Sequence, residues 1–312
     1  MRPLAEPVIS ERLVVRERTI DPMLLSVAVV WGLNPVANKW VLEAMGPAGV
    51  LAFRYVGCTV VLLWAAWRIN GRAAFHASTP PLTMWIVGAL VGAQQLMYIY
   101  ALDWTTASEG ALLISVAPIW TALTGAALGM ERISGANWLG IFAAAGGVAL
   151  LVMGGHNAGP EASHPLAGNL LMLLSSLLYG GGMVYLKRVM DQYEPVRVMA
   201  WAFVFGSVMV IPAGYGQLVG ADWPQFNATL WGAMLYSAFL SGGWGMVVWY
   251  QTIARTTAAR TAVYQYLVPV VALVGSWALL GDRLLPLQLL GAAIVIPGLI
   301  LARRPVFAGP SD

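Results

Sequence analysis

Residues 105–140 read TTASEGALLISVAPIWTALTGAALGMERISGANWLG, and residues 256–291 read TTAARTAVYQYLVPVVALVGSWALLGDRLLPLQLLG. The two stretches align without a gap at a constant shift of 151 positions, which places Pro118 on Pro269. Each is a long apolar segment that contains a proline, ends in an acid–arginine turn and passes into a second apolar run. Self-similarity on this scale indicates an internally duplicated architecture.

The duplication extends toward the amino terminus, where the shift is 148 positions. There Lys39 falls on Lys187 and Pro47 falls on Pro195. The first half of the chain therefore matches the second half, and the change of shift from 148 to 151 means three extra residues in the second copy.

The composition excludes an ordinary water-soluble globule. Of the 312 residues, 59% are hydrophobic and 10% are charged, whereas a soluble domain carries about 25% charged residues. The formal charge of +3 is small and the basic residues are dispersed, so the sequence gives no support to nucleic-acid binding. A single cysteine, Cys58, allows no intrachain disulfide, and no Cys/His cluster has metal-ligand spacing, so we expect neither a metal nor a cofactor.

Ten apolar segments have the length of about 20 residues that a helix needs to span a bilayer. They are 22–42, 47–67, 81–102, 104–128, 132–154, 167–187, 195–215, 229–254, 256–280 and 283–302. Because each copy holds five, an odd number, the copies must cross the membrane in opposite senses, as in many secondary transporters. The expected fold is an all-α membrane protein of ten transmembrane helices in two inverted five-helix repeats. The expected domains are the repeats 22–154 and 167–304, with tails at 1–21 and 305–312.

The lysines and arginines of the loops predict the orientation. With the amino terminus inside, fourteen of them lie at cytoplasmic ends of the spans and one, Arg283, lies outside. Residues 1–21 are polar and lack the apolar core of a signal peptide. We therefore expect both termini in the cytoplasm.

Several motifs together resemble the EamA family of the drug/metabolite transporter superfamily. They are WGLNPVANKW in the first span, PAGVLAFRY at the start of the second, the Thr-Thr-Ala stretch that leads to Pro118, and the Gly-Met-Glu-Arg turn. The resemblance covers about residues 22–304 and implies a ten-helix exporter of the bacterial cytoplasmic (inner) membrane with a cavity between the repeats. Known members export amino acids and related metabolites, and relatives carry sugars, nucleotide sugars and drugs. The second copy departs from the first where Ala202 matches Arg54.

Three charged residues inside predicted spans need an explanation, because a charge costs a few kcal/mol near the bilayer centre. Lys39, Arg54 and Glu109 all fall in the outer part of the membrane under the expected topology. One interpretation is an outer gate, or a site for a substrate carboxylate at Lys39 or Arg54. The other is a structural ion pair in which Glu109 neutralises one of the two cations.

Polar and aromatic residues on repeat-matched spans predict a substrate cavity. An aromatic lining with a few polar groups suits an amphiphilic small molecule, and amide side chains that faced lipid would be costly. Span-end aromatic residues such as Trp249 and Tyr250 have the alternative explanation of an interfacial belt. The predicted substrate-binding residues are Asn34, Arg54, Gln94, Gln95, Tyr98, Trp244, Tyr264 and Gln265.

Prolines and glycines predict where the spans bend or approach one another. Pro35, Pro118 and Pro269 each lie inside a span and should kink it. The glycine runs at 180–182 and at 242–245 favour close helix packing over a functional role.

These features favour a secondary transporter over other classes. The chain has no nucleotide-binding loop, no span with two acids and no histidine in a span, so we expect neither ATP-driven transport nor an enzyme. A receptor or scaffold is the alternative of another class.

Amino acids or related metabolites are the expected substrates, with hydrophobic drugs or nucleoside-like solutes as the alternative. Glu109 is the one obvious proton carrier, and facilitated diffusion would need none. The expected partners are a small-molecule substrate and the lipid bilayer, and the expected state is a monomer or weak homodimer.

Overall fold

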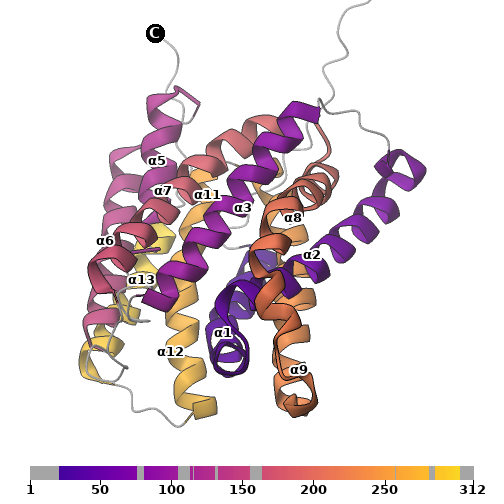
Figure 1. Ribbon diagram of the computed structural model, residues 1–312. Coiled ribbons are helices and arrows are strands. Elements are labelled where there is room, and N and C mark those ends of the chain that lie inside the picture. The colour runs from indigo at the N-terminus through magenta and orange to yellow at the C-terminus, as the bar shows by residue number, and fades with distance from the viewer. Residues whose placement is uncertain are drawn as a thin grey trace, which may run out of the picture.

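The computed structural model describes residues 21–75, 81–104, 113–114, 116–130, 133–154, 164–256, 258–280 and 285–302. Within these ranges every regular element is a helix (Figure 1), which confirms the all-α class. Nearly all of the two predicted tails, and Glu109, lie outside the described residues.

The first half of the chain forms long helices that begin at prolines. Asp21 caps the first of them, because its side chain accepts a hydrogen bond of 2.8 Å from the Met23 backbone N–H, and a proline at the first position has no N–H to leave unpaired. The second helix ends at Gly71, whose φ of 58° suits glycine. The elements are α1 (Pro22–Ala44), α2 (Pro47–Asn70), η1 (Gly71–Phe75), α3 (Pro81–Trp104), α5 (Ala117–Ala127) and α6 (Gly135–Gly154).

The second half repeats this plan with more interruptions. Glu194 caps α8 by accepting hydrogen bonds from the backbone N–H groups of Val196 and Arg197 at 3.0 and 2.6 Å. The elements are α7 (Pro165–Met190), α8 (Pro195–Val219), η2 (Trp223–Gln225), α9 (Ala228–Leu235), η3 (Tyr236–Trp244), α10 (Gly245–Arg255), α11 (Ala258–Ala262), η4 (Val263–Tyr266), α12 (Leu267–Leu280) and α13 (Pro286–Ala302). The η3 segment is a π-helix, whereas η1, η2 and η4 are 3-10 helices.

Four helical stretches are long and apolar enough to cross a membrane: Pro47–Phe75, Leu82–Trp104, Leu166–Met190 and Pro195–Val219. Shorter apolar helices occupy Pro22–Asn34, Gly135–Leu150, Val263–Gly275 and Pro286–Ala302. Large apolar side chains such as Leu166 and Trp64 point outward, at 74% and 59% exposure, as they would toward lipid. The total of ten spans stays a prediction.

Helix contacts follow the duplication. Both α6 with α13 and α2 with α8 are pairs of repeat equivalents that pack on each other. The helix α3 packs on α7 and α8, and its equivalent, the α9–η3–α10 segment, packs on α1 and α2. Likewise, α12 packs on α1 as α5 packs on α7 (Figure 1). If each helix is replaced by its equivalent in the other half, every one of these contacts becomes another contact that is also observed. This is the relationship that a pseudo-two-fold axis produces.

Glycines allow the closest of these approaches. A Cβ atom at Gly140 would lie 2.7 Å from the Gly298 carbonyl oxygen, and one at Gly147 would lie 2.8 Å from that of Gly291. Because Gly140 is equivalent to Gly291 and Gly147 to Gly298, the α6–α13 crossing has the same form from both sides. Gly180 likewise faces the Ala117 carbonyl oxygen, at 2.3 Å from a Cβ position. Close packing is thus the role of these glycines.

The three prolines predicted to kink spans have different positions. Pro118 and Pro269 both lie in the first turn of their helices, α5 and α12, and a change of helix geometry precedes Pro269 at η4. The backbone of α1 stays helical through Pro35.

Candidate functional site

A narrow crevice lies between α1, α2 and the α9–η3 segment. About 180 Å³ of space lies between its atoms, part of it open to the exterior, and in this conformation the walls are too close together to admit a water-sized sphere. Its polar lining consists of Asn38 from α1, Arg54 from α2 and Ser237 from η3, and the rest of the wall is Val41, Val50, Phe53 and Met234. An apolar wall with a few convergent polar groups is the usual form of a small-molecule site.

Arg54 places a positive charge in this crevice. Its guanidinium interacts with the Cys58 thiol, and its Nε lies 3.4 Å from the position that a Cβ atom of Gly242 would take. No carboxylate in the part of the chain that the structure describes forms an ion pair with Arg54. The side chain of Lys39, like Glu109, lies outside the described residues, and the predicted charge cluster stays a prediction.

Two hydrogen-bonding atoms of the crevice have no partner among the described residues: Asn38 Oδ1 and Ser237 Oγ. Asn34 Oδ1 and Ser241 Oγ, which lie about one turn from Asn38 and Ser237, also have no hydrogen-bond partner among the described residues. Buried polar groups in native proteins are nearly always hydrogen-bonded. Several buried side-chain oxygens at the boundary between α1 and η3 are therefore available to form a hydrogen bond with a ligand.

The π-helix η3 brings Ser237 and Ser241 to this boundary, where they are 2% and 0% exposed. It is held there by Trp31 Nε1, which donates to the Ser241 carbonyl oxygen at 2.9 Å, and by the Tyr236 hydroxyl, which donates to that of Val30 at 2.7 Å. Short π-helical segments are frequent at functional sites. Sequence analysis missed Asn38, Ser237 and the π-helix; the nearest signal was the glycine run at 242–245.

Two of the predicted cavity residues, Gln94 and Gln265, form hydrogen bonds with side chains of α7. Gln94 Nε2 donates to Ser175 Oγ at 3.0 Å, and Ser175 Oγ donates to the Gln94 carbonyl oxygen at 3.2 Å. Gln265 Nε2 donates to the Tyr179 hydroxyl. Both amides thus face the interior, where they join α3 and η4 to α7.

The other predicted residues lie at separate places. Tyr264 is buried, and its hydroxyl accepts a hydrogen bond of 2.8 Å from the Asp21 backbone N–H, so that it holds the start of α1. Trp244 ends η3 and is 36% exposed. Gln95 and Tyr98 are half-buried on α3, and Tyr98 interacts electrostatically with Arg54. A single cavity shared by all of these residues stays a prediction.

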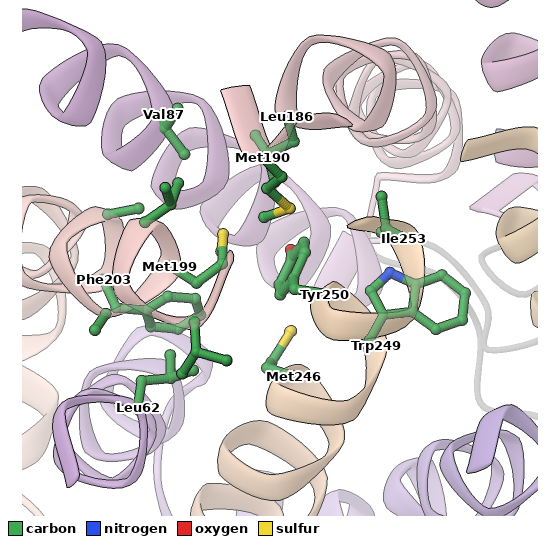
Figure 2. Close-up of a cluster of buried hydrophobic side chains, with 14 of the residues drawn as sticks. Leu62, Val87, Leu186, Met190, Met199, Phe203, Met246, Trp249, Tyr250 and Ile253 are labelled. Atoms are coloured by element: carbon green, nitrogen blue, oxygen red, sulfur yellow. The ribbon is translucent and has the colours of Figure 1, made fainter. Parts of the chain in front are cut away.

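The end of the bundle opposite the crevice is closed by buried apolar side chains. Met190, Met199 and Met246 converge on Tyr250 (Figure 2), with Leu186 beside them, and we call these five residues the methionine plug. They come from the end of α7, the start of α8 and the first half of α10.

The crevice lies at the start of α2, and this position sets it apart from the plug. The start of α2 packs on the end of α8, where Gln217 Oε1 accepts a hydrogen bond of 2.9 Å from the Gly49 backbone N–H. Since the plug includes Met199, near the start of α8, the two features lie at opposite ends of the α2–α8 pair.

Comparison with protein families gives a match to the model described as "EamA-like transporter family", which covers residues 18–153 and again residues 166–304.

Related proteins match along most of their length. A "Probable terminal-alkyne amino-acid exporter" of Streptantibioticus cattleyicolor is 28% identical over 90% of this chain and 92% of its own. A "Probable amino-acid metabolite efflux pump" of Escherichia coli is 26% identical over 89% and 93%. An "Uncharacterized transporter" of Archaeoglobus fulgidus is also 26% identical, over 89% and 95%. A solved structure titled "Crystal structure of protein" has the same fold, with a TM-score of 0.75 and 17% identity over 90% of this chain and 94% of that one.

Proposed function

The chain belongs to the EamA-like transporter family, and on this premise we propose that it is a secondary transporter that exports amino acids or related small metabolites by alternating access. It is an integral membrane protein of a transporter family. The two relatives named for amino-acid export and for efflux of amino-acid metabolites support both the direction and the substrate class.

The observation that carries this proposal is the interchange of helix contacts between the two halves, combined with their unequal ends. One end is closed by the methionine plug and the other holds a polar crevice. In an inverted repeat, each half can adopt the packing of the other, which opens one end as it closes the opposite one.

We further propose ten spans, with repeats at 22–154 and 167–304 and with both termini in the cytoplasm of a bacterium. In that orientation the methionine plug lies at the cytoplasmic side and the crevice lies at the outer side. The expected state in the membrane is a monomer or weak homodimer.

The substrate-binding role stays proposed for the residues that the sequence analysis named, and the crevice adds Asn38 and Ser237 to them. An apolar wall that includes Val41, Phe53 and Met234 also suits the alternative substrates, hydrophobic drugs or nucleoside-like solutes. Proton coupling would run through Glu109, and facilitated diffusion would need no carrier group.

Flux through purified protein in proteoliposomes tests the proposal. The panel would contain apolar, aromatic and polar amino acids, a nucleoside and a cationic dye, each measured with and without a pH gradient. Saturable flux of an amino acid that competing amino acids inhibit is the expected result. Binding of a solute with no flux across the membrane would identify a receptor instead. Gradient-driven flux that survives in Glu109→Gln would remove the coupling role.

A further inference from the structure

The crevice brings together one cation and two hydrogen-bonding groups from three different elements: Arg54 of α2, Asn38 of α1 and Ser237 of η3. Asn38 is 7% exposed and Ser237 is 2% exposed. Asn38 Oδ1 and Ser237 Oγ have no hydrogen-bond partner in the part of the chain that the structure describes. A hydroxyl and an amide beside a guanidinium can supply the donors of an anion site when the amide presents its NH₂ group.

The positive charge of Arg54 needs compensation in a membrane interior. Removal of a guanidinium from water is costly unless it is paired, and no described carboxylate pairs with it. A planar guanidinium binds a carboxylate through two parallel N–H donors. The Ser237 hydroxyl can donate a third hydrogen bond, and the Asn38 amide can present its NH₂ group by rotation about its last torsion.

Comparison of the two halves shows that packing does not require these polar residues. The equivalents of Asn38 and Arg54, at a shift of 148, are Leu186 and Ala202, and the equivalent of Ser237, at 151, is Ile86. All three equivalents are apolar; Leu186 and Ala202 are buried, whereas Ile86 is 42% exposed. The fold therefore accommodates apolar side chains at the second-half positions that are equivalent to Asn38 and Arg54. These two polar residues of the first half have a cost without a packing need, and together with Ser237, which the second half contributes, they point to a ligand.

We propose that Arg54, Asn38 and Ser237 bind the carboxylate of an amphiphilic solute, whose apolar part lies against Val41, Phe53 and Met234 when the crevice widens to admit it. This rests on the proposed transport function and assigns its substrate class: small monocarboxylates with an apolar body, which include apolar amino acids. Neutral and cationic drugs do not use the site.

A matched pair of probes tests the assignment by binding alone. The probes are 3-phenylpropanoate and 3-phenylpropanamide, which share shape and differ in the carboxylate. Titration of the full chain in lipid nanodiscs at millimolar probe, by calorimetry, should give a preference for the carboxylate of about tenfold or more, because charge-assisted hydrogen bonds are about twice as strong as neutral ones.

Variants taken from the second half make the test specific. Arg54→Ala and Asn38→Leu introduce the residues that the fold holds at the equivalent positions. Arg54→Ala should bring the carboxylate-to-amide ratio to about one, and Asn38→Leu and Ser237→Ala should each lower it by about threefold or more, since each removes one hydrogen bond to the anion. Arg68→Ala, an exposed position on the same helix, should keep the wild-type ratio. If Arg54→Ala does not fold, Arg54→Lys keeps the charge without the two-pronged donor and should lower the ratio.

Equal binding of both probes by the wild type, binding of neither, or a preference that survives in Arg54→Ala would each overturn the proposal. Equal binding is the result expected if Arg54 instead forms a structural ion pair with Glu109. Because the assay measures binding and not transport, it can contradict the carboxylate site without contradicting the transport function, and a flux assay can do the reverse. A carboxylate preference without flux contradicts the transporter, and amino-acid flux without the preference contradicts the carboxylate site.

Discussion

Tyr55 stacks on Phe203, the residue that holds its own position in the second half of the chain, with ring centroids 4.7 Å apart and planes inclined by 26°. One turn further along, Thr59 Oγ1 lies 3.4 Å from Ser207 Oγ, and these two residues are again equivalents. A residue can contact its own equivalent only near a symmetry axis. The pseudo-two-fold axis of the molecule therefore passes between α2 and α8, beside the crevice.

We expect Tyr55→Phe to fold as stably as the wild type. The Tyr55 hydroxyl is buried and has no partner among the described residues, so its removal leaves no acceptor unpaired there and makes the pair symmetrical. Phe203→Ala should instead cost about 3–5 kcal/mol, because it leaves a cavity on the axis. Thermal midpoints in detergent measure both. A midpoint for Tyr55→Phe as low as that of Phe203→Ala would show that the hydroxyl has a structural role.

Adjacent glycines of α6 should respond in opposite ways to alanine. A Cβ atom at Gly147 would lie 2.8 Å from the Gly291 carbonyl oxygen, whereas one at Gly146 would have nothing within 4 Å. Gly146→Ala should therefore stabilise the protein by about 0.5–1 kcal/mol, the helix-propensity difference, and Gly147→Ala should destabilise it by separating α6 from α13. Unfolding midpoints of the two variants provide the measurement, and Gly146→Ala is the matched control. Equal midpoints would contradict the tight crossing.

The sequence was sufficient for the helical class, and the close packing expected of the glycine run at 180–182 is seen at Gly180, where a Cβ atom would lie 2.3 Å from the Ala117 carbonyl oxygen. The alignment of Gly140 with Gly291 and of Gly147 with Gly298 is visible in the sequence, but that α6 and α13 cross at these glycines was not predicted from it. The sequence also predicted that Gln265 and either Gln94 or Gln95 face the interior, because an amide that faces lipid is costly; the structure shows Gln94 in this position.

Pairing between distant helices could not be predicted in the same way. Ser175 and Tyr179, which bond Gln94 and Gln265, lie on a helix whose apolar pattern does not mark them. The π-helix η3 was not predicted, because a short segment with i→i+5 hydrogen bonds does not change the apolar character of the sequence. The π-helix helps to set the position of Ser237 beside Arg54, and this contact between distant segments is not visible in the local sequence.

Single cysteines test the proposed orientation. Gly220 and Gln192 are exposed and follow α8 and α7 at opposite ends of the bundle, whereas the native Cys58 is buried. In intact cells, Gly220→Cys should react with a membrane-impermeant thiol reagent, and Gln192→Cys should react only after permeabilisation. The unmodified chain controls for labelling of Cys58. The reverse pattern would place both termini outside.

The end of the bundle with the methionine plug has a polar link that should help to hold it closed. Lys187 Nζ donates to Asp191 on its own helix and, at 3.2 Å, to the Ala254 carbonyl oxygen near the end of α10. This contact joins α7 to α10 beside the plug residues Met190 and Tyr250. If the two helices separate when this end opens, loss of the link should favour the open state.

Lys187→Met should therefore raise the reactivity of a cysteine placed in the plug. The reporter is Met199→Cys, a position that is fully buried in the closed end, and its labelling is followed in inside-out vesicles. Arg188→Met is the matched control, because the neighbouring Arg188 is exposed and should leave reactivity unchanged. The hydrogen bond that joins the two helices, from Lys187 Nζ to the Ala254 carbonyl oxygen, contributes about 0.5–1.5 kcal/mol, which corresponds to a rise of about two- to tenfold. Equal reactivity in both variants would show that the apolar plug alone closes this end.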